Sequence, residues 1–156
     1  GGAYSKSQGR IDSIKLARQS EINAEIEKKI EEKLKDYAAE VKALREQLAI
    51  QQDIIAMKSL SLKVTAKFSK SGSKRTVKVT WTPSSKISGV KYQLYKSAKK
   101  SAGFKKLTTT SKTTIRNTSG LRKGNTYYYK VRAYKYLKGK YYYSGWSNVR
   151  SCKISK

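Results

Sequence analysis

The sequence predicts an α + all-β protein, in which one long helix precedes a seven-stranded β-sandwich. Two observations predict this fold class. Residues 11–58 contain no Gly and no Pro, and Ala, Glu, Lys, Gln, Leu and Ile dominate them, which is typical of a helix. After residue 59 the hydrophobic period falls to two, and clusters of turn residues separate short β-rich runs.

The chain begins with residues 1–10, which are small and polar and include three glycines. This composition predicts a flexible arm. Residues 11–59 are then expected to form one helix, and either Asp12 or Ser13 can cap its start. A helix this long beside one small domain has nowhere to bury its apolar stripe, so we expect it to need partner helices.

The apolar stripe follows the alternating spacing of three and four residues that is typical of a left-handed coiled coil. The predicted oligomerisation seam consists of Leu34, Tyr37, Val41, Leu44, Leu48, Gln51 and Ile55. Upstream, Ile22, Ile26 and Ile30 step by four, which breaks the heptad and indicates local unwinding. We expect a parallel homo-oligomer, with a trimer ahead of a dimer, because the seam mixes aliphatic residues and a glutamine without a clear dimer pattern.

The same helix could also bury its apolar side chains in two other ways. Its amphipathic face could fold back on the C-terminal domain of the same chain. Ile50, Ile54 and Met57 lie partly off the seam, and we expect them to bury against the next domain or against a neighbouring chain.

Residues 60–156 are expected to form the sandwich, because seven short runs of alternating character fit into fewer than 100 residues. The predicted strands are Leu62–Phe68, Thr76–Trp81, Val90–Lys96, Phe104–Thr109, Thr113–Asn117, Tyr127–Tyr134 and Asn148–Ile154. The predicted core consists of Trp81, Tyr92, Leu94, Leu121, Tyr127, Tyr129 and Val131.

Charge divides the chain into two electrically different parts. All ten acidic residues lie between Asp12 and Asp53, whereas residues 61–156 hold 25 Lys and Arg and no acid. Such asymmetry is typical of contact with a polyanion, such as nucleic acid, an acidic polysaccharide or an anionic membrane surface. The alternative is a lysine-rich secreted protein whose charge mainly maintains solubility.

Several classes of function lack the residues they require. The chain has one cysteine, Cys152, and no histidine, so neither an internal disulfide nor a Cys/His metal cluster can form, and no cofactor is expected. The C-terminal region has no carboxylate for acid–base catalysis, so we expect no enzyme there. No apolar run approaches the ~20 residues of a membrane span, and no signal-peptide pattern opens the chain.

Three motifs in residues 60–156 resemble a fibronectin type III domain of the kind found in surface proteins of Gram-positive gut bacteria and their phages. They are "VTWTP" around Trp81, "KYQLYKS", and "GLRKGNTYYYKVRAY". The last contains the family's Leu-x-x-Gly-x-x-Tyr corner, here Leu121, Gly124 and Tyr127. The resemblance implies that the Tyr127 hydroxyl bonds to backbone across that corner. There is no Arg-Gly-Asp triplet, so the resemblance implies no integrin binding.

The tyrosine-rich stretch from Thr126 to Trp146 supplies the candidate binding residues. Alternation places Tyr127, Tyr129, Val131 and Ala133 toward the core and leaves a stripe of aromatic and basic side chains outward. The candidates for binding a polyanion or carbohydrate are Tyr128, Lys130, Arg132, Tyr134 and Tyr142. Rings interleaved with cations suit stacking combined with charge neutralisation, although the same residues also serve as ordinary cross-strand partners or as contacts with a protein.

These observations predict a non-catalytic structural or adhesive component of a bacterial cell surface or phage virion. The helix would anchor or oligomerise the chain, and the basic sandwich would contact anionic surface polymers. A genome- or nucleic-acid-binding protein and an accessory module of a cell-wall enzyme are the alternatives. Against the former, no helix-turn-helix, zinc-finger or RNP motif is present.

Overall fold

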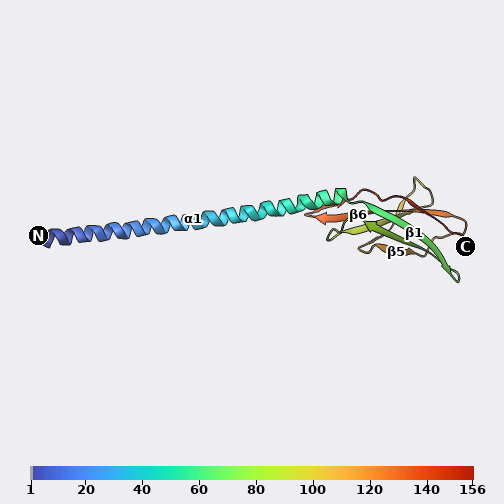
Figure 1. Ribbon diagram of the computed structural model, residues 1–156, viewed down its shortest axis with the longest axis horizontal. Coiled ribbons are helices and arrows are strands. Elements are labelled where there is room, and N and C mark those ends of the chain that lie inside the picture. Colours follow the sequence, from blue (N-terminus) through green and yellow to red (C-terminus); the bar gives the residue numbers. More distant parts are fainter. Residues whose placement is uncertain (1) are drawn as a thin grey trace. The chain divides into compact units, whose positions relative to one another are not determined.

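The computed structural model describes residues 2–156, with side chains from Ser5 onward, and it contains one helix followed by two sheets (Figure 1). Helix α1 spans Gly2–Ser59. It therefore includes residues 2–10, for which the sequence predicts a flexible arm, while Gly1 lies outside the described residues. Side-chain bonds one turn apart accompany this helical start: Gln8 Nε2 donates to Asp12 Oδ1 at 3.2 Å, and Ser13 Oγ donates to the Gly9 carbonyl at 3.0 Å.

The chain divides into two compact units, of which the first ends at Leu48 and the second comprises Ala49–Lys156. The second unit thus includes the last turns of α1, although the sequence predicts a domain that begins at residue 60. Within this unit Met57 is fully buried and Leu60 is 5% exposed, and both belong to the sandwich core. Lys135 Nζ lies 2.8 Å from Asp53 Oδ2, which adds an ion pair between the helix end and the sheet.

Eight strands form two antiparallel sheets. They are β1 (Leu62–Ser71), β2 (Lys74–Pro83), β3 (Lys91–Ser97), β4 (Lys105–Thr110), β5 (Thr114–Asn117), β6 (Thr126–Leu137), β7 (Lys140–Tyr143) and β8 (Arg150–Lys153). The first sheet has the order β1-β2-β5. The second has the order β4-β3-β6-β7, and β8 also pairs with β6. The fold class is therefore the one that the sequence predicts, a long helix followed by a β-sandwich.

Strand β7 is the element that the seven predicted strands do not include. Three consecutive tyrosines, Tyr141–Tyr143, show no polar–apolar alternation, so they carry no period-two signal. The turn before them forms the hairpin: Lys138 has φ 42° and Gly139 has φ 80°. Positive φ at both central residues is the geometry of a tight two-residue hairpin, in which Leu137 pairs with Lys140.

The core between the sheets contains every residue that the sequence predicts for it. Trp81 and Tyr92 lie side by side with ring centroids 5.7 Å apart, and Leu94, Tyr129 and Val131 are fully buried. Large apolar side chains from both sheets thus exclude water from one continuous core, which is the main stabilising contribution in a domain of this size.

The tyrosine corner also forms as the resemblance implies. The backbone N–H of Arg122 donates to the Tyr127 hydroxyl at 3.0 Å. Lys96 Nζ lies 4.5 Å from the centre of the Tyr127 ring and donates to the carbonyls of Ser119 and Gly120 at 3.3 and 3.2 Å. This arrangement fixes the crossing between the two sheets just before β6.

Candidate functional site

The predicted stripe lies on the outer side of the five-stranded sheet, along the even-numbered residues of β6. Tyr127, Tyr129, Val131 and Ala133 are buried, as alternation predicts. Their neighbours Tyr128, Lys130, Arg132 and Tyr134 point the other way but are half-buried rather than exposed. Other side chains therefore cover part of the stripe.

Aromatic rings provide that cover for the two central cations. Lys130 Nζ lies 4.4 Å from the ring centre of Phe104 and 4.2 Å from that of Trp146. The Arg132 guanidinium carbon lies 4.1 Å from the ring centre of Tyr143 and 4.8 Å from that of Trp146. Each cation is thus held between two rings, with Trp146 shared between them.

Further contacts extend this arrangement in both directions. Arg132 Nε donates to Gln93 Oε1 at 2.8 Å, and Tyr95 meets Trp146 edge-on with centroids 4.9 Å apart. Tyr134 contacts Tyr141 and Tyr143 at centroid distances of 5.7 and 6.0 Å. We call this surface the aromatic face and define it by Phe104, Lys130, Arg132, Tyr134, Tyr141, Tyr143 and Trp146.

The segment that follows β7 positions Trp146 through paired hydrogen bonds to β6. Ser144 accepts from the Ala133 N–H through its hydroxyl and donates its own N–H to the Ala133 carbonyl, at 2.8 and 2.9 Å. Ser147 repeats both bonds with Val131, each at 2.8 Å. Two serine hydroxyls thus replace the carbonyls that a regular neighbouring strand would offer. Trp146 lies between these serines in the sequence, and its ring contacts Lys130 and Arg132.

Asn148 carries the same segment across to the other sheet. Its Oδ1 accepts from the Val64 N–H at 2.8 Å and its Nδ2 donates to the Val64 carbonyl at 3.1 Å. Residues 144–148 therefore join β6 to β1 by side-chain bonds to backbone. Because these partners are distant in sequence, spacing alone gives no signal for the role of Trp146.

Two of the five candidate residues lie apart from the aromatic face. Tyr142 pairs with Lys135, so it lies on the opposite side of the hairpin from Tyr141 and Tyr143. The prediction that places Tyr142 in the outward stripe is therefore wrong. Tyr128 faces outward but pairs with Ser97 and Ser151, away from the ring contacts. Lys130, Arg132 and Tyr134 are brought together, whereas Phe104, Tyr141, Tyr143 and Trp146 are members of the aromatic face that the five candidates do not include.

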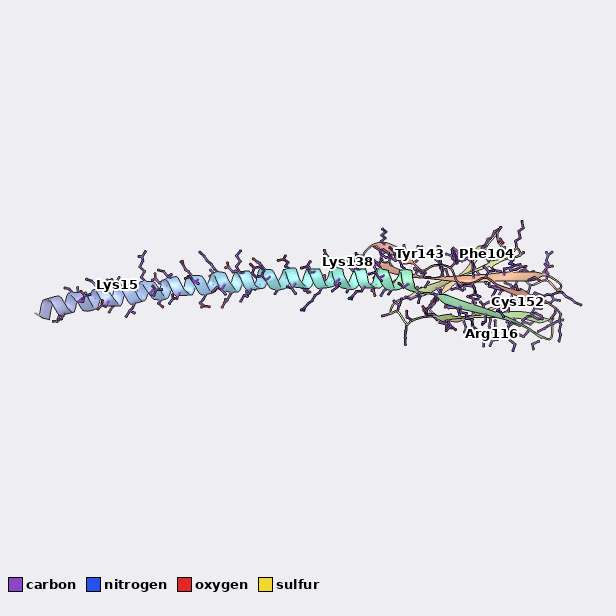
Figure 2. The ribbon with its side chains drawn as sticks, turned by 45° about the horizontal axis from the view of Figure 1, so that its top comes forward. Lys15, Phe104, Arg116, Lys138, Tyr143 and Cys152 are labelled. Atoms are coloured by element: carbon purple, nitrogen blue, oxygen red, sulfur yellow. The ribbon has the colours of Figure 1, made fainter. Side chains whose placement is uncertain are left out.

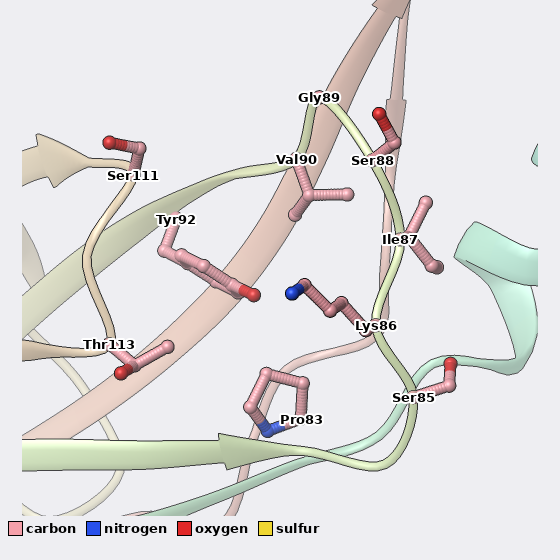
Figure 3. Close-up of a pocket in the computed structure, with 10 residues that line it drawn as sticks. All are labelled: Pro83, Ser85, Lys86, Ile87, Ser88, Gly89, Val90, Tyr92, Ser111 and Thr113. Carbon is pink, nitrogen blue, oxygen red and sulfur yellow. The ribbon is translucent and has the colours of Figure 1, made fainter.

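A surface pocket of about 480 Å³ opens at the end of the sandwich where β2 leaves the sheet (Figure 3). Pro83, Ile87, Val90 and Tyr92 give it an apolar wall, and Lys86 points its ammonium toward the Tyr92 hydroxyl. No carboxylate, histidine or cysteine lines this pocket. Its polar groups are therefore an ammonium and several hydroxyls.

Buried titratable groups in the sandwich serve packing. Burial raises the pKa of Tyr129, whose hydroxyl donates to Asn117 Oδ1 at 2.9 Å. Burial also raises the pKa of Cys152, which keeps its thiol protonated and unreactive at neutral pH. Among residues 5–156 no three His, Cys, Asp or Glu side chains gather in a group that could hold a metal. None of the described helical sequence is long and apolar enough to cross a membrane.

Comparison with known proteins yields little beyond the fold. No protein-family model matches the chain, and no curated protein matches its sequence. Among solved structures, a chain of a cytokine receptor complex is similar at 18% sequence identity with a TM-score of 0.46. The match covers 59% of this chain and 50% of that one, so this chain corresponds to about half of the receptor-complex chain.

Proposed function

We propose that the chain is a non-catalytic structural or adhesive component of a bacterial cell-surface or phage virion assembly. In this proposal α1 associates with further copies of itself, and the basic sandwich contacts anionic polymers of the surface. The observation that carries it is the exposed seam of α1. Six large side chains of that seam are between 45% and 62% exposed, namely Leu34, Tyr37, Val41, Leu44, Leu48 and Ile55.

An exposed seam of this kind favours association, because each apolar side chain gains roughly 1.5–3 kcal/mol when it is fully buried. Isolated amphipathic helices gain most of their stability by packing this face. The spacing of the seam matches the holes of a second identical helix, so we assign copies of the same chain as its partners, with a trimer ahead of a dimer.

Charges beside the seam favour parallel chains. With Leu34 at the first apolar position of a heptad, Glu40 falls at the last position of that heptad and Arg45 falls five residues later. In a parallel, in-register coiled coil Glu40 of one helix faces Arg45 of the neighbouring helix. In an antiparallel coiled coil each of these heptad positions would instead face the same heptad position of its partner. Within one helix the two side chains are about 140° apart and cannot meet.

The sandwich leaves room for partner helices. Within the second unit, Met57 of α1 is fully buried in the sandwich core, and Ile50 and Ile54 are half-buried. Gln51 and Ile55, which continue the seam, are exposed. At 100° per residue the centre of Ile50, Ile54 and Met57 lies about 110° around the helix from that of Gln51 and Ile55, so the seam lies to one side of the buried residues and stays accessible to a partner helix.

The charge of the sandwich supports the second half of the proposal. Residues 61–156 carry 25 cations without an acid, and Asp53 is the one acidic residue of the second unit. Its pair with Lys135 is the one ion pair within residues 5–156. The other cations therefore repel one another, and a polyanion relieves that repulsion while its counterions are released.

The oligomer is tested by light scattering on the full chain. Leu44→Asp should reduce the mass to that of a monomer, whereas Ala43→Asp, which adds the same charge one residue away from the seam, should leave the oligomer intact. Glu40→Arg alone should weaken association, and adding Arg45→Glu should restore it if the chains are parallel. A wild-type monomer at micromolar concentration would contradict the proposed assembly.

Polyanion contact is tested by measuring binding at increasing salt, where counterion release requires a steep loss of affinity. The probes are poly(glycerol phosphate), polygalacturonate and duplex DNA. A preference for DNA would favour the nucleic-acid-binding alternative, and no binding to any probe at low salt would refute a role for the charge in recognition.

A further inference from the structure

The outer side of the three-stranded sheet carries a row of cations that no feature described above uses. Lys67 of β1 lies directly opposite Lys78 of β2, and Lys78 lies directly opposite Arg116 of β5. All three side chains are exposed, whereas Val64, Val77 and Val79 point into the core from the same strands. Figure 2 shows Arg116 on the opposite side of the sandwich from Phe104 and Tyr143 of the aromatic face.

Hydroxyl groups form the next row of this surface. Thr65, Thr80 and Thr114 are opposite one another two residues further along the same strands. The hydroxyl oxygens of Thr80 and Thr114 lie 3.0 Å apart. Lys63 and Lys74 point to the same side by alternation and are exposed. We call this surface the cationic face and define it by Lys63, Lys67, Lys74, Lys78 and Arg116 with the three threonines.

Nothing within the described residues neutralises this row. The one ion pair there joins Lys135 to Asp53, and the cationic face contains neither a carboxylate nor an aromatic ring. Like charges directly opposite in a sheet destabilise it. Residues that lower stability in this way are expected where a surface serves binding. On the aromatic face, by contrast, Lys130 and Arg132 are already held between rings.

We propose that the cationic face is the principal polymer-binding surface and that its ligand is an acyclic polyol phosphate, a linear chain of sugar alcohols joined by phosphate diesters. The inference rests on the proposed function, because it names the face and the polymer through which the sandwich makes its contact. Lys and Arg donate hydrogen bonds that the phosphate oxygens of such a chain accept. The hydroxyls of Thr65 and Thr114 already donate to the carbonyls of Thr80 and Val79, and their oxygens can accept from the hydroxyl groups of the polyol.

The absence of rings on this face distinguishes the polyol phosphate from single-stranded nucleic acid and from polymers of ring sugars. Single-stranded nucleic acid gains much of its affinity by stacking bases on aromatic side chains, and flat sugar rings are also recognised by stacking. An acyclic polyol has no flat ring to stack. It requires only cations and hydroxyls at intervals along an open surface, which is what three neighbouring strands about 4.8 Å apart present.

The test compares two triple variants with the same change in charge. The first is Lys67→Gln, Lys78→Gln and Arg116→Gln. The matched control is Lys99→Gln, Lys100→Gln and Lys105→Gln, three exposed residues of which Lys105 begins β4 and the other two precede it. With poly(glycerol phosphate) as the probe, the first variant should lose more than about tenfold in affinity, and its salt slope should fall by about 2, at about 0.7 per lost contact. The control should change affinity less than about twofold.

Each outcome separates this inference from the proposed function. If wild type binds none of the polymers, the proposed function fails as well. If wild type binds but both variants lose affinity equally, the charge acts diffusely and the assignment to this face is wrong. Tighter binding of polygalacturonate, of single-stranded DNA or of duplex DNA, again lost in the first variant, would overturn the polyol phosphate as the ligand.

A stability measurement checks the like-charge row itself. Lys78→Gln removes the central cation and should raise the melting temperature by roughly 2–4 °C at low salt, while it weakens polymer binding. The gain should shrink in high salt, where the charges are screened. A lower melting temperature would contradict the repulsion on which the assignment depends.

Discussion

Replacing Ser144 by Ala should destabilise the sandwich far more than the loss of one surface hydroxyl would. The Ser144 hydroxyl accepts the backbone N–H of Ala133 at 2.8 Å, and Ala133 is fully buried while Ser144 is 7% exposed. Removing the acceptor leaves that N–H without a partner in a place where water does not reach. An unsatisfied buried donor costs about 1–3 kcal/mol of the free energy of unfolding.

Ser84→Ala is the matched control because it removes the same kind of bond in an exposed place. The Ser84 hydroxyl accepts the Ser61 N–H at 3.0 Å, and both residues are exposed, so water can replace the lost partner. We expect a change within about 0.5 kcal/mol there. Ser147→Ala repeats the first experiment at Val131, which is also fully buried.

The assay is urea unfolding followed by tryptophan fluorescence, which reports only on the second unit because Trp81 and Trp146 both lie in it. A domain of about 100 residues loses roughly 4–8 °C in melting temperature for each kcal/mol. Ser144→Ala should therefore melt several degrees below wild type. If it unfolds within 0.5 kcal/mol of Ser84→Ala, the serine hydroxyls are not substitutes for the missing strand carbonyls.

Three further outcomes are expected. Trp81→Ala should lower the free energy of unfolding by about 3–5 kcal/mol, because it empties the centre of the core, and an unchanged urea midpoint would contradict this. Trp146→Ala should cost about 1–2 kcal/mol by removing the ring shared by two cations, whereas Trp146→Phe should retain most of that stability in the same titration. Burial raises the pKa of Tyr129, so above pH about 10 the unfolded chain releases a proton that the folded chain retains, and the free energy of unfolding falls as pH rises. In Tyr129→Phe this alkaline loss of stability should be smaller. An equal loss in both proteins would refute the role of the Tyr129 hydroxyl in it.

Much of the aromatic face depends on strand pairing that the sequence does not reveal. Alternation along β6 correctly separates Tyr129 from Lys130, because it is a property of one strand. Which ring covers Lys130 depends on how β6 aligns with its neighbours and on the course of the chain after β7. The misplaced Tyr142 has the same cause, since a one-residue shift in hairpin register exchanges the two sides of a strand.

The sequence by itself determined the helix, the change to strands after residue 59, the buried tyrosines of β6 and the division of charge, because each depends on residues close together along the chain. Only the tertiary structure decided that Met57 and Leu60 belong to the sandwich core, that Trp146 stands between Lys130 and Arg132, and that three cations line up across β1, β2 and β5. These contacts join residues distant in sequence. Their geometry is set by strand register and by which surfaces exclude water, and neither is encoded in local periodicity.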